Sequence, residues 1–279
     1  MRDDTSCDDV LSEAEIDTFA RKGVIRLEGF LPHERLHAAK AAVLEVLERE
    51  GVRRDGRWLL DPLEPSDAPA AGLQLTRGLK RSPALENLAT PELLAAIEVL
   101  VEGRAFAPLT DHAQVLFTLP NADVWTVPHS IWHLDVPRLP SGKPPGVQLF
   151  TFLDSVKPGG GGTLVVAGSH RFLNDEGFVR SKDVKRRLKR EPYFADLMSK
   201  DMKDRERFVK EPGRVGDIDV QVVELHGASG DVYLTDLRLL HTLAPNATSV
   251  PRMMLTQRFM CEDAVKEMHW AFSRDRTSK

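Results

Sequence analysis

The chain has 279 residues, enough for one large domain or two small ones. Hydrophobic residues make up 42% and charged residues 29%, a balance typical of globular proteins with a sizeable core. A net charge of −4 gives no reason to expect a nucleic-acid partner. The sequence contains no run of about 18 apolar residues, so we expect no membrane span. The polar N-terminus lacks a signal-peptide core, and Cys7 and Cys261 do not make a disulfide framework, so we expect a reducing, cytoplasmic location.

Helical patterns dominate the first hundred residues. They predict helices over 12–23, 33–50 and 91–101, which would buttress the rest of the chain. Ser12 and Glu15 form a capping-box pattern at the start of the first helix. A strand at 24–27 follows it. Residues 51–90 are rich in proline and predict an irregular covering segment, anchored to the core by Trp58.

From about residue 105 the pattern changes to short strands separated by glycine and proline turns. The segments rich in strand-forming residues are 114–119, 124–127, 131–136, 147–153, 163–166, 218–223, 230–234, 239–243 and 252–260. Many short strands of this kind favour a sandwich or closed barrel over a parallel sheet. We therefore predict one domain, 1–279, that is mainly β with flanking helices and has its core at about 105–262.

Residues 174–212 interrupt the strands with a charged segment. A basic run at 182–190 is followed by acidic residues that alternate with further bases, which predicts a helical insertion. Two interpretations stand side by side. The insertion is either a pair of solvated surface helices or a lid over an active site, where its bases would contact a polar or anionic substrate.

The sequence Trp132-His133-Leu134-Asp135 is the centre of the functional hypothesis. Residues two apart in a strand point to one face, so His133 and Asp135 could reach a common point. His241 would supply a third ligand, and two histidines with one carboxylate form the facial triad that holds ferrous iron. Alone, the H-x-D pattern is common by chance, and zinc accepts the same ligand types.

Arg252 follows His241 by 252 − 241 = 11 residues, at the start of the next strand. A guanidinium can donate two parallel hydrogen bonds to a carboxylate. Arg252 could therefore hold the distal carboxylate of a keto acid whose other end chelates the metal, with a surface ion pair as the alternative. Gln114, on an earlier strand, either faces the same cavity or is a core polar group bonded to backbone.

Five motifs in this order resemble the phytanoyl-CoA dioxygenase superfamily of Fe(II)/2-oxoglutarate-dependent oxygenases. They are W-H-x-D at 132–135, G-G-T-L-V-V-A-G-S-H-R at 161–171, G-D-V-Y-L at 230–234, L-H-T-L-A-P-N at 240–246 and P-R at 251–252. The resemblance implies a double-stranded β-helix, a cupin-like jelly-roll core. It also implies that His133, Asp135 and His241 bind iron, that Arg252 binds 2-oxoglutarate and that Thr151 contacts this co-substrate.

The same resemblance implies a reaction. Fe(II), 2-oxoglutarate and O2 would oxidise an unactivated C–H bond of a small-molecule metabolite, most simply by hydroxylation, with release of succinate and CO2. Desaturation, cyclisation and epimerisation stay open, and bacterial secondary metabolism is the setting that analogy suggests. Related halogenases carry a small residue at the position of Asp135, so this carboxylate argues against halogenation. A zinc hydrolase and a non-catalytic jelly-roll binding module are the alternatives from other classes.

Overall fold

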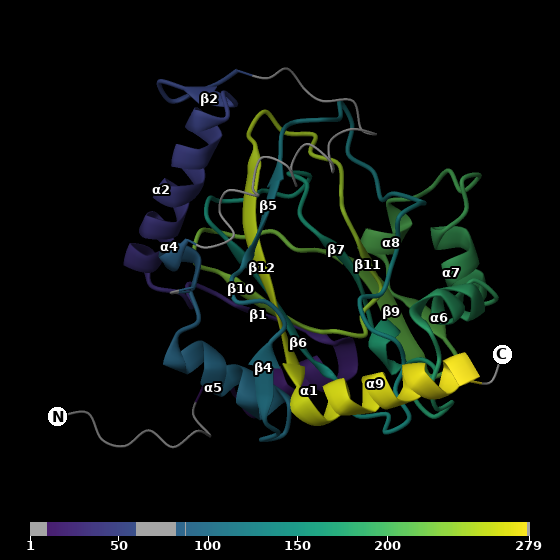
Figure 1. The fold of residues 1–279 in the computed structure, drawn as a ribbon. Coiled ribbons are helices and arrows are strands. Elements are labelled where there is room, and N and C mark those ends of the chain that lie inside the picture. Colours follow the sequence, from purple (N-terminus) through teal and green to yellow (C-terminus); the bar gives the residue numbers. More distant parts are fainter. Residues whose placement is uncertain (1–9, 60–81, 87, 278–279) are drawn as a thin grey trace.

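Two antiparallel sheets form the centre of the molecule (Figure 1). The computed structural model describes residues 10–59, 82–86 and 88–277. The larger sheet contains β1 (Val24–Leu27), β10 (Val232–Asp236), β6 (Gly146–Phe152), β12 (Arg252–Cys261) and β4 (Phe106–Pro108) in that order, with β5 (Gln114–Thr118) also paired to β12. The smaller sheet contains β11 (His241–Thr242), β7 (Leu164–Ala167), β9 (Ile218–Glu224) and β8 (Gly213–Val215) in that order. A separate hairpin pairs β2 (Arg53–Arg54) with β3 (Arg57–Trp58).

Helices cover the sheets from two sides (Figure 1). One side carries α2 (His33–Arg49), α4 (Pro83–Glu86) and α5 (Pro91–Leu100), and the opposite side carries α6 (Ser181–Leu188), α7 (Pro192–Leu197) and α8 (Arg207–Lys210). The remaining helices are α1 (Glu13–Lys22), the 3-10 turn η3 (Ser169–Arg171) and α9 (Glu262–Thr277). Each described helix is too short or too polar to cross a lipid bilayer.

Local sequence signals fix α1 as expected. The Ser12 side chain accepts a hydrogen bond from the Glu15 amide, and the Glu15 carboxylate accepts one from the Ser12 amide at 2.7 Å. Gly23 ends the helix in the left-handed conformation, with φ of 72°, and its amide bonds to the Phe19 carbonyl. A side chain at position 23 would also collide with His170, because its Cβ would lie 2.6 Å from Nδ1 of that imidazole. Glycine is therefore required here by conformation and by space.

Strand β6 separates two packed layers, and all seven of its residues are buried. Val147 and Leu149 point toward the core under α2 and α5. Phe150 and Phe152 point the other way and pack with Val165 of the smaller sheet. Burying each such side chain contributes about 1.5–3 kcal/mol, so both layers stabilise the strand that lies between them.

The structure corrects part of the expected strand order. The segments 124–127 and 131–136 do not form strands, and the second contributes only an isolated bridge between His133 and His241. Alternating β-formers therefore gave the wrong prediction where no neighbouring strand offers backbone partners.

Helix α9 was not predicted from the sequence. Trp58 contacts Phe117 at 5.7 Å between ring centroids, while most of the proline-rich stretch, at 60–81, lies outside the described residues.

Candidate active site

A cavity of about 190 Å³ opens between the two sheets. Its floor is the face of the larger sheet that carries alternate residues of three neighbouring strands. These residues are Gln114, Leu116 and Thr118 of β5, Arg252, Thr256 and Arg258 of β12, and Gln148 and Phe150 of β6. The period-two alternation of strands places them on one face. His133 and His241 complete the wall, so imidazoles and guanidiniums share one small space.

The two histidines are held together through their backbones. The His133 amide donates to the His241 carbonyl at 2.9 Å, and the His241 amide donates to the His133 carbonyl at 3.0 Å. Such a pair of residues sits directly opposite in an antiparallel bridge. Their ring centroids are consequently 4.2 Å apart. A single bridge thus replaces the strand that we expected to align His133 with the site.

Each imidazole is oriented by a carbonyl of its own segment. His133 Nδ1 lies 2.9 Å from the Ile131 carbonyl oxygen, and His241 Nδ1 lies 3.0 Å from that of Leu239. A carbonyl only accepts, so Nδ1 is the donor in both rings, and Nε2 is the nitrogen of each ring that is left for a metal. Burial lowers the pKa of His241, although Asp135 opposes this shift, and the neutral ring is the form that binds metals.

Asp135 completes a three-residue cluster. Its carboxylate oxygens lie 4.0 Å from His133 Nε2 and 3.7 Å from His241 Nε2. One ligand atom from each residue lies within 4.8 Å of the others. Because both free Nε2 atoms and the carboxylate converge, the donor set fits a divalent metal with open positions. Side-chain exposure differs across the cluster: His133 is 51% exposed, whereas His241 is 9% exposed.

Arg258 binds the Asp135 carboxylate from the cavity face of β12. Its Nε donates to Asp135 Oδ2 at 2.6 Å, and no described residue donates a hydrogen bond to Oδ1. Arg258 shares the cavity face with Arg252, six residues earlier on β12. Outer groups of this kind fix the orientation of a metal-binding carboxylate. We did not single out Arg258 from the sequence, although counting in twos from Arg252 along the strand reaches it.

Replacing Arg258 with methionine is expected to weaken divalent metal binding by about tenfold to a hundredfold, because Asp135 loses the donor that orients it. Anaerobic titration with Mn²⁺ measures the change. Arg214→Met, at an exposed position on β8, provides the baseline for losing an arginine. Parental Mn²⁺ affinity in Arg258→Met would show that Asp135 holds its orientation unaided.

Arg252 is buried, and none of the residues that the structure describes gives it an acidic partner. It is 3% exposed, its Nη1 donates to the Gly161 carbonyl at 2.5 Å and its Nη2 donates to Thr118 Oγ1 at 2.7 Å. Among the described residues its Nε has no acceptor. Burial lowers the pKa of Arg252 to about 10, so the guanidinium remains charged at neutral pH. A buried cation that lines a cavity with an unused donor fits the binding of an anionic group.

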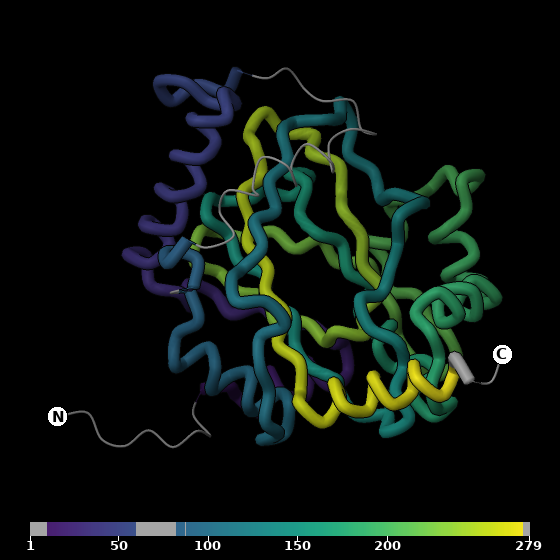
Figure 2. Tube along the Cα trace, in the orientation of Figure 1, coloured from purple at the N-terminus to yellow at the C-terminus, as the bar shows by residue number. Residues whose placement is uncertain are grey.

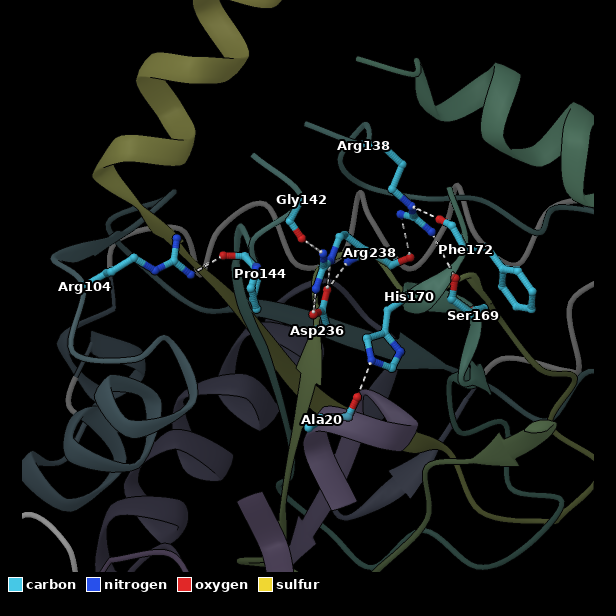
Figure 3. Close-up of polar contacts among 10 residues, drawn as sticks. All are labelled: Ala20, Arg104, Arg138, Gly142, Pro144, Ser169, His170, Phe172, Asp236 and Arg238. Carbon is cyan, nitrogen blue, oxygen red and sulfur yellow. Dashed lines mark hydrogen bonds and ion pairs between the residues drawn. The ribbon is translucent and has the colours of Figure 1, made fainter. Parts of the chain in front are cut away.

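A second buried network braces the two ligand-bearing segments (Figure 3). Arg138, three residues after Asp135, donates to the carbonyls of Phe172, Arg238 and Ser169 at 2.8, 3.1 and 3.0 Å. Arg238, three residues before His241, pairs with Asp236 through Nε at 3.0 Å and Nη2 at 2.8 Å. Ser169 Oγ accepts from the Leu240 amide at 2.9 Å. These bonds fix the backbone on both sides of the site.

His170 belongs to this network and not to the metal cluster. Its Nε2 lies 3.1 Å from the Ala20 carbonyl oxygen, so it ties η3 to α1 (Figure 3). Burial lowers the pKa of His170, which keeps the ring neutral. The histidine of the G-S-H motif therefore holds a turn.

The structure places the two remaining predicted residues differently. Gln114 lines the cavity, as the prediction required for a co-substrate contact. Thr151 does not reach it: its neighbours Gln148 and Phe150 alternate toward the cavity side, while Thr151 lies with Leu149 on the helix-covered face. Its Oγ1 donates to the Asp231 carbonyl at 2.9 Å. Gln148, Thr256 and Thr163 line the cavity instead and were missed from the sequence.

Known structures share this fold at low sequence identity. The crystal structure of AviO1 from Streptomyces viridochromogenes Tue57 is 20% identical, with 89% of this chain and 94% of that chain covered and a TM-score of 0.51. SnoK, a non-haem alpha-ketoglutarate-dependent carbocyclase from nogalamycin biosynthesis, is 19% identical, with 92% and 86% covered and a TM-score of 0.52. EctD from S. alaskensis in its apoform is 17% identical, with 92% and 80% covered and a TM-score of 0.54. No curated protein sequence matches the chain.

The family assignment comes from a sequence model. The model of phytanoyl-CoA dioxygenase (PhyH) matches residues 19–254, which is most of the chain and includes the histidine–aspartate cluster and Arg252. This match agrees with the resemblance noted in the motifs at 132–252. The chain therefore belongs to the phytanoyl-CoA dioxygenase family and is a non-haem iron, 2-oxoglutarate-dependent enzyme.

Proposed function

We propose that the enzyme hydroxylates an unactivated C–H bond of a small-molecule metabolite, at a site within a double-stranded β-helix core. His133, Asp135 and His241 are the proposed iron ligands, and Arg252 is the proposed partner of the 2-oxoglutarate carboxylate. The observation that carries this proposal is the convergence of three donor atoms within 4.8 Å, at a cavity that the buried Arg252 also lines.

The core assignment is supported by how the two sheets meet. Both are antiparallel, and side chains from each interleave in one apolar cluster beneath the cavity. The His133–His241 bridge joins the segment after β5 to the start of β11. The bridge therefore gives the open edge of the smaller sheet, at β11, a partner in the segment that carries His133.

The protein groups supply orientation, charge and exclusion of water. Bound iron would contribute the activation of O2 and the oxidation of the substrate carbon. His133, Asp135 and His241 would hold the ion through their three donor atoms, and a site with only three protein ligands would leave room for 2-oxoglutarate and O2. Asp135 carries one negative charge, and Arg258 offsets part of it. The apolar wall at Leu116 and Phe150 excludes water from the reacting groups.

Arg252 fixes the far carboxylate of the co-substrate. Its guanidinium is held in place by Thr118 and Gly161, so little side-chain entropy remains to be lost on binding. The pairing of two opposite charges away from water is strong, because the surrounding dielectric is low. Gln114 pairs with Thr256, four residue pairs along the sheet from Arg252, and lines the same cavity as a neutral hydrogen-bonding group.

Arg252→Met is expected to raise the KM for 2-oxoglutarate by about a hundredfold, which corresponds to roughly 3 kcal/mol for a lost buried charge pair. Succinate formation at graded 2-oxoglutarate concentrations measures it. Mn²⁺ binding in the absence of 2-oxoglutarate should stay at the parental level, since Arg252 does not contact the three donors. An unchanged KM would remove Arg252 from the co-substrate site.

The substrate is proposed to be a small molecule, supported by the size of the cavity and by the origin of SnoK in nogalamycin biosynthesis. The basic run does not add support for an anionic substrate. Lys185 bonds to a backbone carbonyl, Arg186 pairs with Asp183 and Arg187 pairs with Glu176. An anionic substrate therefore stays a prediction. The cytoplasmic location expected from the sequence also stays a prediction.

The decisive experiment is a turnover assay on anaerobically purified protein. With Fe(II), O2 and 2-oxoglutarate, a panel of metabolites should include one that raises succinate formation and gains one oxygen atom from O2, as read by mass spectrometry. Zn²⁺ in place of Fe(II) should give no turnover. Substrate loss without O2, or in the presence of Zn²⁺ alone, would replace the oxygenase assignment with a hydrolase.

A further inference from the structure

The segment that carries the first proposed iron ligand has no sheet to support it. In the part of the chain that the structure describes, residues 123–132 make no backbone–backbone hydrogen bond, and His133 is the first residue after them that does. Within this segment Ile131 is 58% exposed and has a φ of 55°. A β-branched residue in the left-handed region is strained and persists only where its surroundings fix the backbone. We call residues 123–135 the ligand loop.

The helical insertion, which contains α6, α7 and α8, supplies that support. The ligand loop runs beside it along the chain path of Figure 2. Trp132 is 1% exposed and lies with Val127 and Leu134 in one apolar cluster with the insertion. The members from the insertion are Val184, Leu188, Phe194, Leu197, Met198 and Phe208. The inner face of the loop is therefore packed against the insertion.

Two cations of the insertion bind the loop carbonyls. Arg205, between α7 and α8, donates through Nε to the Val127 carbonyl and through Nη2 to the Pro128 carbonyl at 3.0 Å. The same guanidinium donates to the carbonyls of Leu197 at 2.6 Å and Ser199 at 3.0 Å. One planar group therefore joins two carbonyls of the loop to two of the insertion.

Lys185 makes the second link, to the residue that immediately precedes His133. Its Nζ donates to the Trp132 carbonyl at 3.0 Å, and the Trp132 indole donates to the Pro128 carbonyl at 2.8 Å. The carbonyls of Val127, Pro128 and Trp132 are thus satisfied by side chains in place of a neighbouring strand. The Ile131 carbonyl that orients the His133 ring lies between these anchored points.

We propose that the insertion is a clamp for the ligand loop, in which Arg205 and Lys185 are positioning residues for His133. This inference rests on the proposed ligand role of His133. It assigns the insertion a function different from the two interpretations that the sequence offered, since Arg205 and Lys185 bind backbone carbonyls of the ligand loop. Lost anchoring should loosen the His133–His241 bridge and lower metal affinity.

The test uses the full chain and three single substitutions. Arg205→Gln and Lys185→Met remove the two links, and Arg207→Gln is the matched control. Arg207 lies in the same insertion, pairs with Asp196 at 2.6 Å and makes no bond to the loop. Hydrogen exchange of the His133 and His241 amides is measured in metal-free protein, and Mn²⁺ affinity is measured separately under anaerobic conditions.

We expect exchange at both amides to accelerate about tenfold and Mn²⁺ to bind about tenfold more weakly in Arg205→Gln, with smaller changes of the same sign in Lys185→Met. Arg207→Gln should change neither. If Arg205→Gln does not fold, Lys185→Met decides alone. Parental exchange rates in the folded variants would overturn the clamp, and faster exchange with parental Mn²⁺ affinity would overturn its role in positioning. Absence of Mn²⁺ binding in the parent protein would refute the iron site, while the exchange rates still decide whether the clamp exists.

Discussion

Asp135→Ala is expected to reduce 2-oxoglutarate-dependent succinate formation by about a thousandfold, which corresponds to about 4 kcal/mol in transition-state free energy. The substitution removes the only carboxylate of the cluster that the structure places between His133 and His241. It also leaves Arg258 without its partner, so a positive charge faces the position of the metal. Two imidazoles beside an unpaired cation should hold a divalent ion poorly.

The measurement combines succinate assays with anaerobic Mn²⁺ titration of the same protein samples. Asp219→Ala, at an exposed position on β9, removes an aspartate without touching the cavity and should leave both readouts unchanged. Turnover within tenfold of the parental rate in Asp135→Ala would exclude Asp135 as a ligand.

The second large effect concerns stability. Arg138→Met is expected to lower the free energy of unfolding by about 3 kcal/mol, because three buried carbonyls lose their donor at about 1 kcal/mol or more each. Arg138 is fully buried, and the structure gives it no acidic partner among the described residues. Burial, together with nearby Arg238, lowers the pKa of Arg138 to about 9, so the folded protein keeps it charged at neutral pH. Relief of this buried charge offsets part of the loss but restores no hydrogen bond.

Urea denaturation of the metal-free protein measures this change. Arg186→Met is the control, because Arg186 lies on α6 with a side chain that is 69% exposed, and surface substitutions change stability by about 0.5 kcal/mol or less. Equal midpoints for the two variants would show that the three carbonyls find other partners and that the network in Figure 3 adds little to stability.

The sequence predicted those parts of the fold that depend on local signals. The capping box at Ser12, the apolar spacing of 33–50 and the β-formers of 252–260 each specify an element that the structure contains. The ligand loop has equally good β-formers at 124–127 but no partner strand, and a sequence pattern carries no information about missing neighbours. Its support comes from Arg205, which lies 205 − 127 = 78 residues after Val127.

The candidate site was likewise predictable only where local sequence order was sufficient. The order of His133, Asp135, His241 and Arg252 identified the cluster before its geometry was known. The orientation of strands decided the rest: Thr151 and Arg258 lie on adjacent paired strands, yet only Arg258 is on the cavity side. One residue of register separates the two faces of a strand, and the sequence alone did not fix which face of β6 was which.

The bridge between His133 and His241 links the site to the folding of the chain. The two residues are 241 − 133 = 108 positions apart, and their mutual hydrogen bonds form only when segments from both ends of the core have docked. Contacts at such separation carry a large loop-closure entropy, so unfolded chains do not hold the two rings together. A metal ion that binds only the completed fold adds stability by mass action, about 2.7 kcal/mol at a concentration one hundred times its Kd. Iron supply would therefore set the stability of the folded enzyme as well as its activity.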